Sequence, residues 1–197
     1  MIDLVKKIGP IEIHKDTIIG EEVVLGYPGK KNIEYLKKEK FNDLPSTIIG
    51  ESSIIRDFTV IYSGTKLGKK VRTGHHVLIR ENCSIGDDCL IGSGTIIEDN
   101  CELGDGVSLQ SGVFLSSGTL IKDDVFIGPG VCITNDRYMD SNIEPVVIQK
   151  GAKIGANSTI LAGITVGKDS VVGGGSVVCD DVRPNSMVYG VPAEERD

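Results

Sequence analysis

Residues 79–97 read Ile79-Arg80-Glu81-Asn82-Cys83-Ser84-Ile85-Gly86-Asp87-Asp88-Cys89-Leu90-Ile91-Gly92-Ser93-Gly94-Thr95-Ile96-Ile97. An isoleucine stands at every sixth position of this stretch, and the fourth residue after each of the first three is small. An α-helix repeats every 3.6 residues and a β-strand every 2, so neither element alone produces a period of six. A short strand followed by a turn does.

The six-residue row extends over most of the chain. It begins at Ile49, and every sixth residue as far as Ile133 is aliphatic except Thr73. A second row, shifted by three residues, runs from Ile148 to Val178. Together 20 of the 21 positions are aliphatic, whereas a composition of 40% hydrophobic residues predicts about 8. Chance does not produce such a row.

A triangular coil explains the pattern. Each side of the triangle is one hexad, the large aliphatic side chain fills the interior, and the small fourth residue leaves it room. Eighteen residues then make one coil, and coils stack at the strand spacing of roughly 4.8 Å, so that backbone hydrogen bonds run along the stack. The 25 glycines, the 5% aromatic content and the lack of tryptophan agree with a narrow core. The sequence therefore predicts an all-β parallel β-helix, a solenoid of hexapeptide repeats.

The repeat resembles that of the hexapeptide-repeat acyltransferases, in which an aliphatic residue is followed by glycine or a polar residue, two variable residues and a small one. The resemblance covers about residues 13–181. The resemblance implies a left-handed β-helix. The handedness rests on the resemblance alone, because the general rule for crossover connections favours the other hand.

We expect a single β-helix domain over residues 1–197, with a short N-terminal insert and one ejected loop. The expected segments are a first coil at 13–26, an insert at 27–47, main coils at 48–133, an active-site loop at 134–147, C-terminal coils at 148–183 and a tail at 184–197. The lysine-rich insert is interpreted as a solvated excursion that caps one end, and a phosphate-binding role is its alternative. The tail resembles the segment that follows the last coil in this family's acyltransferases.

Composition excludes several classes of protein. A net charge of -7 has the wrong sign for holding a nucleic-acid backbone. No apolar run is long enough to span a bilayer, and the N-terminus lacks the features of a signal peptide, so we expect a cytoplasmic protein without a membrane partner. Five cysteines, an odd number, indicate reduced thiols, and Cys83, Cys89 and Cys101 fall on small inward positions of the core.

The hexads stop between Ile133 and Ile148, where the chain continues Thr134-Asn135-Asp136-Arg137-Tyr138. Loops ejected from a solenoid commonly carry function. The string resembles the Thr-Asn-Asp loop of N-acetyltransferases that act on amino sugars attached to a nucleotide diphosphate. The resemblance puts Asn135 and Asp136 at the sugar as catalytic candidates, with Arg137 and Tyr138 as substrate contacts. The alternative is a plain turn, which Asn and Asp both favour.

The proposed chemistry explains these residue types. An amine that attacks a thioester must be oriented and lose a proton, and the developing oxyanion must be stabilised. Asp136 is the candidate for holding or deprotonating the amine. In the resembling enzymes a catalytic histidine lies near the position of Gly112, where this chain has Gln110 and Ser111. No histidine base carries over, and Gln110 and Ser111 remain candidates for substrate binding.

Two further pairs lie at corners of the expected coil. Counting by eighteen puts His75 and His76 on the corner of Ser111, and Arg80 and Glu81 one corner on, beneath Asn135. We predict that the histidines bind the nucleotide or sugar hydroxyls and that Arg80 pairs with a diphosphate. The alternatives are exposed turn residues for the histidines and a surface ion pair for Arg80 and Glu81.

Small residues are frequent after the loop. The resemblance implies that the pantetheine arm of acetyl-coenzyme A lies against this region, which makes Ala156, Ala162 and Gly163 candidates. Lys168 and Arg183 are candidates for its phosphates, because cationic side chains suit that contact. The alternative is that the last coils simply have small turns.

The resemblance thus implies an acetyl-coenzyme A-dependent N-acetyltransferase that transfers acetyl directly to a nucleotide-linked amino sugar, in a homotrimer with sites between subunits. Open alternatives are another small acceptor and a non-catalytic scaffold. No metal is expected, because His14, His75 and His76 lack the spacing of the zinc carbonic anhydrases on this fold. Sugar nucleotidyltransferases with a similar β-helix need an additional nucleotide-binding domain. We do not expect this class, because 197 residues leave no room for that domain.

Overall fold

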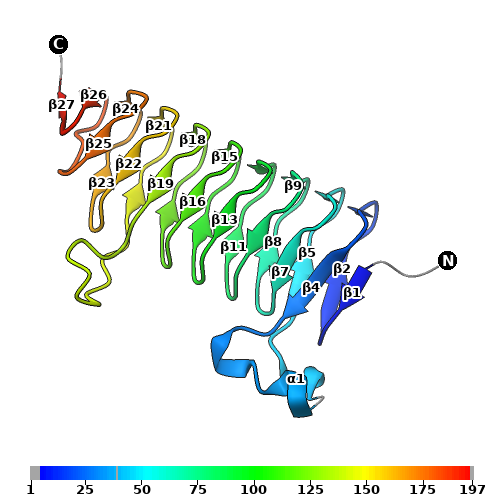
Figure 1. Cartoon of the computed structure of the whole chain (residues 1–197). Helices are drawn as coiled ribbons and strands as arrows, with labels where there is room; N and C mark the ends of the chain where they lie inside the picture. Colours follow the sequence, from blue (N-terminus) through cyan, green and yellow to red (C-terminus); the bar gives the residue numbers. More distant parts are fainter. Residues whose placement is uncertain (1–4, 39, 196–197) are drawn as a thin grey trace.

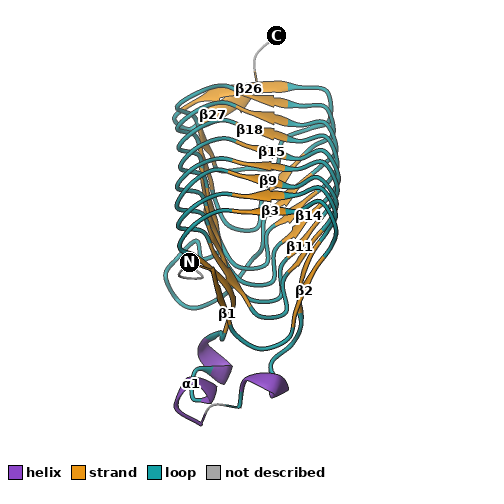
Figure 2. Cartoon of the chain, turned by 90° about the vertical axis from the view of Figure 1, so that its right-hand side faces the viewer, coloured by secondary structure: helices purple, strands orange, loops and turns teal. Residues whose placement is uncertain are grey.

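A computed structural model describes residues 5–38 and 40–195. These residues form a parallel β-helix whose three sheets run the length of a triangular prism (Figures 1 and 2). The all-β solenoid predicted from the hexads is confirmed, and the coil is consistent with the left-handed form. Across residues 5–38 and 40–195, no helix has the length and hydrophobicity needed to cross a membrane.

Each turn of the coil contributes one strand to each of three sheets. Sheet A contains β1 (Val5–Lys7), β4 (Val23–Tyr27), β7 (Val60–Tyr62), β10 (Leu78–Ile79), β13 (Ile96–Ile97), β16 (Phe114–Leu115), β19 (Cys132–Ile133), β22 (Thr159–Ile160) and β25 (Val177–Val178). Sheet B contains β2 (Ile11–Ile13), β5 (Thr47–Ile49), β8 (Lys66–Leu67), β11 (Ser84–Ile85), β14 (Glu102–Leu103), β17 (Leu120–Ile121), β20 (Val147–Ile148) and β23 (Thr165–Val166). Sheet C contains β3 (Ile18–Ile19), β6 (Ile54–Ile55), β9 (Arg72–Thr73), β12 (Leu90–Ile91), β15 (Ser108–Leu109), β18 (Phe126–Ile127), β21 (Lys153–Ile154), β24 (Val171–Val172), β26 (Met187–Gly190) and β27 (Ala193–Glu195).

Most strands are two residues long, with one side chain outside and one inside. Leu90 is half-buried on the outer surface, and Ile91 is fully buried in the core. Thr73, the polar exception in the row, is also fully buried. Its hydroxyl accepts the backbone N–H of Arg56 at 2.9 Å, so a polar side chain fits here without an unpaired group.

The corners of the prism carry the turns between sheets. Asn82, Asp88 and Gly94 end three successive turns with φ of 60°, 57° and 69°, the left-handed region that Gly, Asn and Asp adopt most readily. We name the edges A/B, B/C and C/A after the sheets that meet there. Backbone hydrogen bonds connect each corner with the next one in the stack.

Both ends of the coil extend beyond the expected segments. Strands β1 and β2 start before residue 13, and Ile8 between them is buried although it lies outside the six-residue row. In the tail, β26 pairs in parallel with β24, and β27 turns back antiparallel to it. This hairpin extends sheet C beyond its last coil, and β27 becomes the edge strand at that end.

The insert between β4 and β5 is helical in part. It contains η1 (Lys30–Asn32), α1 (Tyr35–Lys38) and η2 (Phe41–Asp43). It leaves the prism at the A/B edge, because β4 belongs to sheet A and β5 to sheet B.

We predict that Ile91→Ala lowers the free energy of unfolding by roughly 2–5 kcal/mol, since it leaves a cavity in a closely packed core. Leu90→Ala removes a similar side chain from the outer surface and should cost clearly less. Urea unfolding of the two variants against the wild type measures both values. Equal losses would contradict the inside-and-outside alternation along the strand.

Candidate active site

The ejected loop leaves the prism at the A/B edge. It connects β19 of sheet A with β20 of sheet B, and β20 resumes the stack by pairing with β17. Asn135 still belongs to the stacked corner, because its side-chain amide donates to the Ser117 carbonyl at 3.2 Å. The Glu144 N–H donates to the Asn135 carbonyl at 2.8 Å and closes the loop at its base. Residues 136–143 therefore project outward from a fixed neck.

The Asp136 carboxylate organises the projecting part of the loop. It accepts the backbone N–H groups of Asp140 at 3.2 Å and Ser141 at 3.0 Å. The turn that the alternative interpretation predicted is therefore present. The carboxylate remains partly exposed, so the turn leaves part of it open to a ligand.

The next two residues differ in how they are held. Arg137 donates to the Cys179 carbonyl at 2.7 Å and connects the loop with the coil that contains β25. Tyr138 is 74% exposed and points into solvent. Of the two predicted substrate contacts, Arg137 is held against the coil and Tyr138 extends into solvent.

Asn135 lies between two cavities, one on each side of the A/B edge. The cavity toward sheet A has a volume of about 280 Å³ and is lined by Glu98, Phe114, Ser116, Ser117, Thr134, Asn135 and Asp136. The cavity on the other side has about 390 Å³ and is lined by Asp99, Asn100, Ser117, Gly118, Asn135, Ile143 and Pro145. Both predicted catalytic residues thus line a recess that a small ligand can enter.

Polar groups of the stacked corners support Asn135 from below. The Ser117 hydroxyl donates to the Asp99 carboxylate at 2.7 Å. Hydrogen bonds therefore connect Asn135 with Ser117 and Ser117 with Asp99. Ser116 lies beside them with its hydroxyl buried and without a hydrogen-bond partner in the described part of the chain. An unpaired buried hydroxyl is costly, and a ligand oxygen or a small rotation would satisfy it.

Arg80 is paired with carboxylates of its own chain. Its guanidinium donates to both Glu81 oxygens at 3.1 Å and to Glu98 at 2.7 Å. Partial burial lowers the pKa of Arg80, but these hydrogen bonds outweigh it and raise the pKa above its ordinary value. The ion-pair alternative for Arg80 and Glu81 is present in the structure, and Arg80 also extends it to Glu98.

The other predicted substrate residues lie on a different edge of the prism. His75, His76 and Ser111 belong to the C/A corners, and Gln110 lies between β15 of sheet C and Ser111. The His76 ring stacks on Phe58 with the ring centres 4.7 Å apart. Within one chain, sheet A separates these residues from Asn135, so the structure does not bring the two groups together.

The predicted coenzyme contacts are spread over all three edges. Ala156 stacks on the C/A edge, where its carbonyl accepts the N–H of Gly175. Ala162 and Gly163 lie on the A/B edge beside the loop, where Gly163 donates to the Glu144 carbonyl at 2.8 Å. Lys168 and Arg183 line one cavity of about 470 Å³ next to the B/C edge. The two cations therefore lie together, but away from Ala156 and from the pair Ala162 and Gly163.

Sequence reasoning missed Glu98, Phe114 and Ser116 as lining residues. A signal was available, because counting back by eighteen from Thr134 gives Ser116 and then Glu98. The predicted core cysteines are confirmed as buried, and burial raises the pKa of the Cys89 thiol to about 11, so it is not ionised at neutral pH. In the described ranges, no three His, Cys, Asp or Glu residues are grouped as metal ligands would be.

Known proteins with hexapeptide repeats are similar to this chain in sequence and in structure. Residues 82–117 and 145–180 match the model of the bacterial transferase hexapeptide family, described as six repeats. A hexapeptide-repeat-containing acetyltransferase from Vibrio cholerae, solved in complex with acetyl coenzyme A, superimposes with a TM-score of 0.53 and 28% identity over 57% of this chain and 69% of that one. Both findings agree with the hexapeptide-repeat coil, over the residues that match.

Curated relatives match over shorter stretches. The dTDP-3-amino-3,6-dideoxy-alpha-D-galactopyranose 3-N-acetyltransferase of Aneurinibacillus thermoaerophilus is 49% identical over 47 residues, 24% of each chain. The 2,3,4,5-tetrahydropyridine-2,6-dicarboxylate N-acetyltransferase of Clostridium perfringens is 48% identical over 50 residues, 25% of this chain and 21% of that protein. The matches thus span less than a quarter of the length of these relatives, and the two relatives are named for different acceptors.

We predict that Arg137→Ala speeds hydrogen exchange of residues 138–143, because the loop loses its hydrogen bond to the Cys179 carbonyl. Tyr138→Ala, at a neighbouring exposed side chain, should leave exchange unchanged. Exchange measured by mass spectrometry on both variants tests this. The melting temperature should move little in either, since the stacked strands are intact.

Proposed function

We propose that the chain is an acetyl-coenzyme A-dependent N-acetyltransferase whose acceptor is an amino sugar linked to a nucleotide diphosphate. The observation that carries the proposal is Asn135, fixed on the stacked A/B corner between two cavities with Asp136 beside it. The named activities of the relatives support acetyl transfer, and the Aneurinibacillus relative supports the acceptor class.

The reaction needs no covalent intermediate on the protein. The acceptor amine attacks the thioester carbonyl, a C–N bond forms and the C–S bond breaks. The amine nitrogen loses a proton, and coenzyme A leaves as the thiol after gaining one. In this proposal Asn135 orients the amine, and the exposed part of the Asp136 carboxylate accepts a hydrogen bond from it or takes its proton.

The neighbouring residues then contact the rest of the acceptor. The cavity beneath Asn135 offers the Ser117 backbone, the Thr134 side chain and the unpaired Ser116 hydroxyl. Such hydroxyl and carbonyl groups suit the hydroxyls of a sugar ring. The Phe114 ring supplies an apolar wall in the same cavity.

We further propose a homotrimer with each site shared between subunits. The predicted residues lie on separate edges, with Asn135 on A/B and His75 and Ala156 on C/A, and a second copy packed alongside is the simplest way to bring two edges together. The outer face of sheet A supports this packing, because the outward residues Leu78, Ile96 and Phe114 are apolar and only partly buried in the single chain. Coenzyme A would then lie along the contact, near Ala162 and Gly163.

One assay tests the activity. Thiol release from acetyl-coenzyme A is followed against uridine-, thymidine- and guanosine-diphosphate amino sugars, and we expect release with at least one. The panel includes free amino sugars, and tetrahydropyridine dicarboxylate, the acceptor in the name of one relative. If thiol is released only with a non-nucleotide acceptor, the proposed acceptor class is wrong. If no acceptor causes thiol release and the protein does not bind coenzyme A, the protein is a non-catalytic scaffold.

A second experiment tests the assigned residues. Asp136→Asn keeps one of the two oxygen acceptors of the turn and removes the negative charge, so turnover should fall by about a hundredfold. The melting temperature should be nearly unchanged, because the stacked strands are intact. Asp140→Asn, in the same loop with an exposed carboxylate, is the matched control and should keep the wild-type rate. Wild-type turnover in Asp136→Asn would remove Asp136 from the mechanism.

A further inference from the structure

Two excursions leave the prism from the same edge. The insert at 27–47 and the loop at 134–147 both connect sheet A with sheet B, so both project from the A/B edge (Figure 1). Along this edge Glu81, Asp99, Ser117 and Asn135 stack one above the other. Glu81 and Asn135 are three coils apart, which is roughly 14 Å at the strand spacing.

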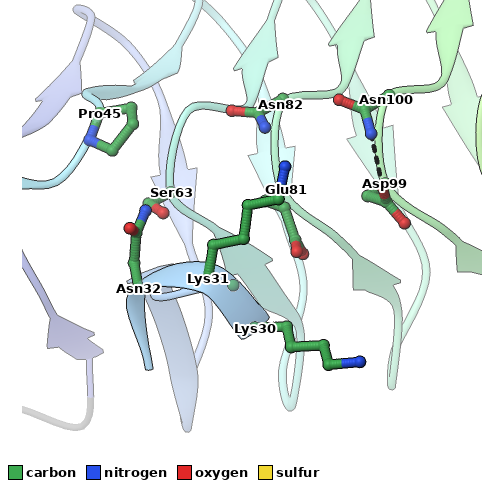
Figure 3. A pocket seen from close by; sticks show the side chains of 10 residues that line it. Lys30, Lys31, Asn32, Pro45, Ser63, Glu81, Asn82, Asp99 and Asn100 are labelled. Atoms are coloured by element: carbon green, nitrogen blue, oxygen red, sulfur yellow. Dashed lines mark hydrogen bonds between the residues drawn. The ribbon is translucent and has the colours of Figure 1, made fainter. Parts of the chain in front are cut away.

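A cavity of about 230 Å³ lies between the insert and this edge (Figure 3). The insert contributes Lys30, Lys31 and Asn32, and the edge contributes residues that include Asn82 and Asn100. In Figure 3 the Lys31 side chain extends toward Asn82. Gly29 is buried against the Glu81 carboxylate, where any side chain would collide with it, so the start of the insert is seated on the coil.

The lining of this cavity carries charges of both signs, but only its carboxylates have partners. Glu81 is paired with Arg80, and the Asp99 carboxylate accepts hydrogen bonds from Ser117 and Asn100. Lys30 and Lys31 have no carboxylate within ion-pair distance among residues 5–38 and 40–195. The two unpaired ammonium groups, on the insert side of the cavity and beside the Asn82 amide, suit an anionic ligand, while Asp99 lies toward Asn135.

This cavity adjoins the proposed acceptor site. Asp99 and Asn100 line both it and the 390 Å³ cavity next to Asn135. A ligand whose amine lies at Asn135 must extend well beyond one sugar ring to reach the lysines. A diphosphate followed by a nucleoside supplies both the length and the negative charge.

We infer that the insert is the binding site for the diphosphate of the acceptor, with Lys30 and Lys31 as its cationic contacts. The inference rests on the proposed function and deepens it. The hydroxyl and amide groups between the lysines and Asn135 then face the sugar, and the nucleoside lies beyond the lysines. Tight binding of the acceptor then requires its phosphates as well as its sugar, because the insert binds the phosphates.

The test measures binding directly, so that it does not depend on turnover. Uridine, thymidine and guanosine diphosphates, and separately coenzyme A, are titrated calorimetrically into the wild type and the double variant Lys30→Ala/Lys31→Ala. We expect at least one nucleoside diphosphate to bind the wild type and the double variant to bind it about tenfold more weakly or worse. Coenzyme A should bind both proteins equally.

The matched control is Lys37→Ala/Lys40→Ala, which removes the same charge from the same insert at exposed positions that do not line the cavity. It should change the affinity less than twofold. Equal weakening in both variants would overturn the inference, as would a wild type that binds no nucleoside diphosphate or a loss confined to coenzyme A. Lys30→Gln/Lys31→Gln replaces the alanine variant if circular dichroism shows that it is misfolded.

The two proposals fail separately. If no acceptor is acetylated but the lysine variant loses the diphosphate, the site stands and the proposed reaction does not. If nucleotide sugars are acetylated, the lysine variant should raise KM for them about tenfold with little change in kcat, and leave KM for the free amino sugar unchanged. An unchanged KM for the nucleotide sugar would contradict the assignment.

Discussion

The stacking of each hexad on the one eighteen residues away is the constraint on which the rest depends. Short parallel strands have little stability alone, but here each backbone bonds to the coil before and the coil after it. The register holds only if an aliphatic side chain such as Ile79 or Ile97 fills the interior in every turn. Once this register is fixed, every corner residue has a defined height along the prism and a defined edge.

The proposed site lies where the register is interrupted without being lost. The loop after Ile133 is ejected between two paired strands, and the coil resumes in the same stack. Asn135 is therefore held by the coil, while residues 136–143 are held by contacts of the loop itself and by Arg137. A binding site gains from this combination, because a ligand can meet fixed groups at the neck and exposed groups above it.

Much of this arrangement follows from the sequence, because a period of six residues and a coil of eighteen assign each repeat residue to a sheet or corner and to a coil. It predicts the inward position of Ile91, the small core role of Cys89 and the stacking of Glu81 beneath Asn135. It does not predict where a side chain outside the repeat turns. Asp136 bonds to the loop backbone and Arg137 reaches the Cys179 carbonyl, and both contacts depend on a loop path that no period describes. The cavity under the insert was missed for the same reason, since it needs Gly29 to seat against Glu81.

The shared edge of the two excursions has a consequence for how such a protein can diversify. Since both leave from A/B corners, the distance between them is a whole number of coils, and it can change only in steps of eighteen residues or one strand spacing. Gaining or losing one coil would shift the insert relative to the loop without turning either of them to another face. Acceptor length would thus be selected in discrete increments, separately from the side chains that recognise the acceptor.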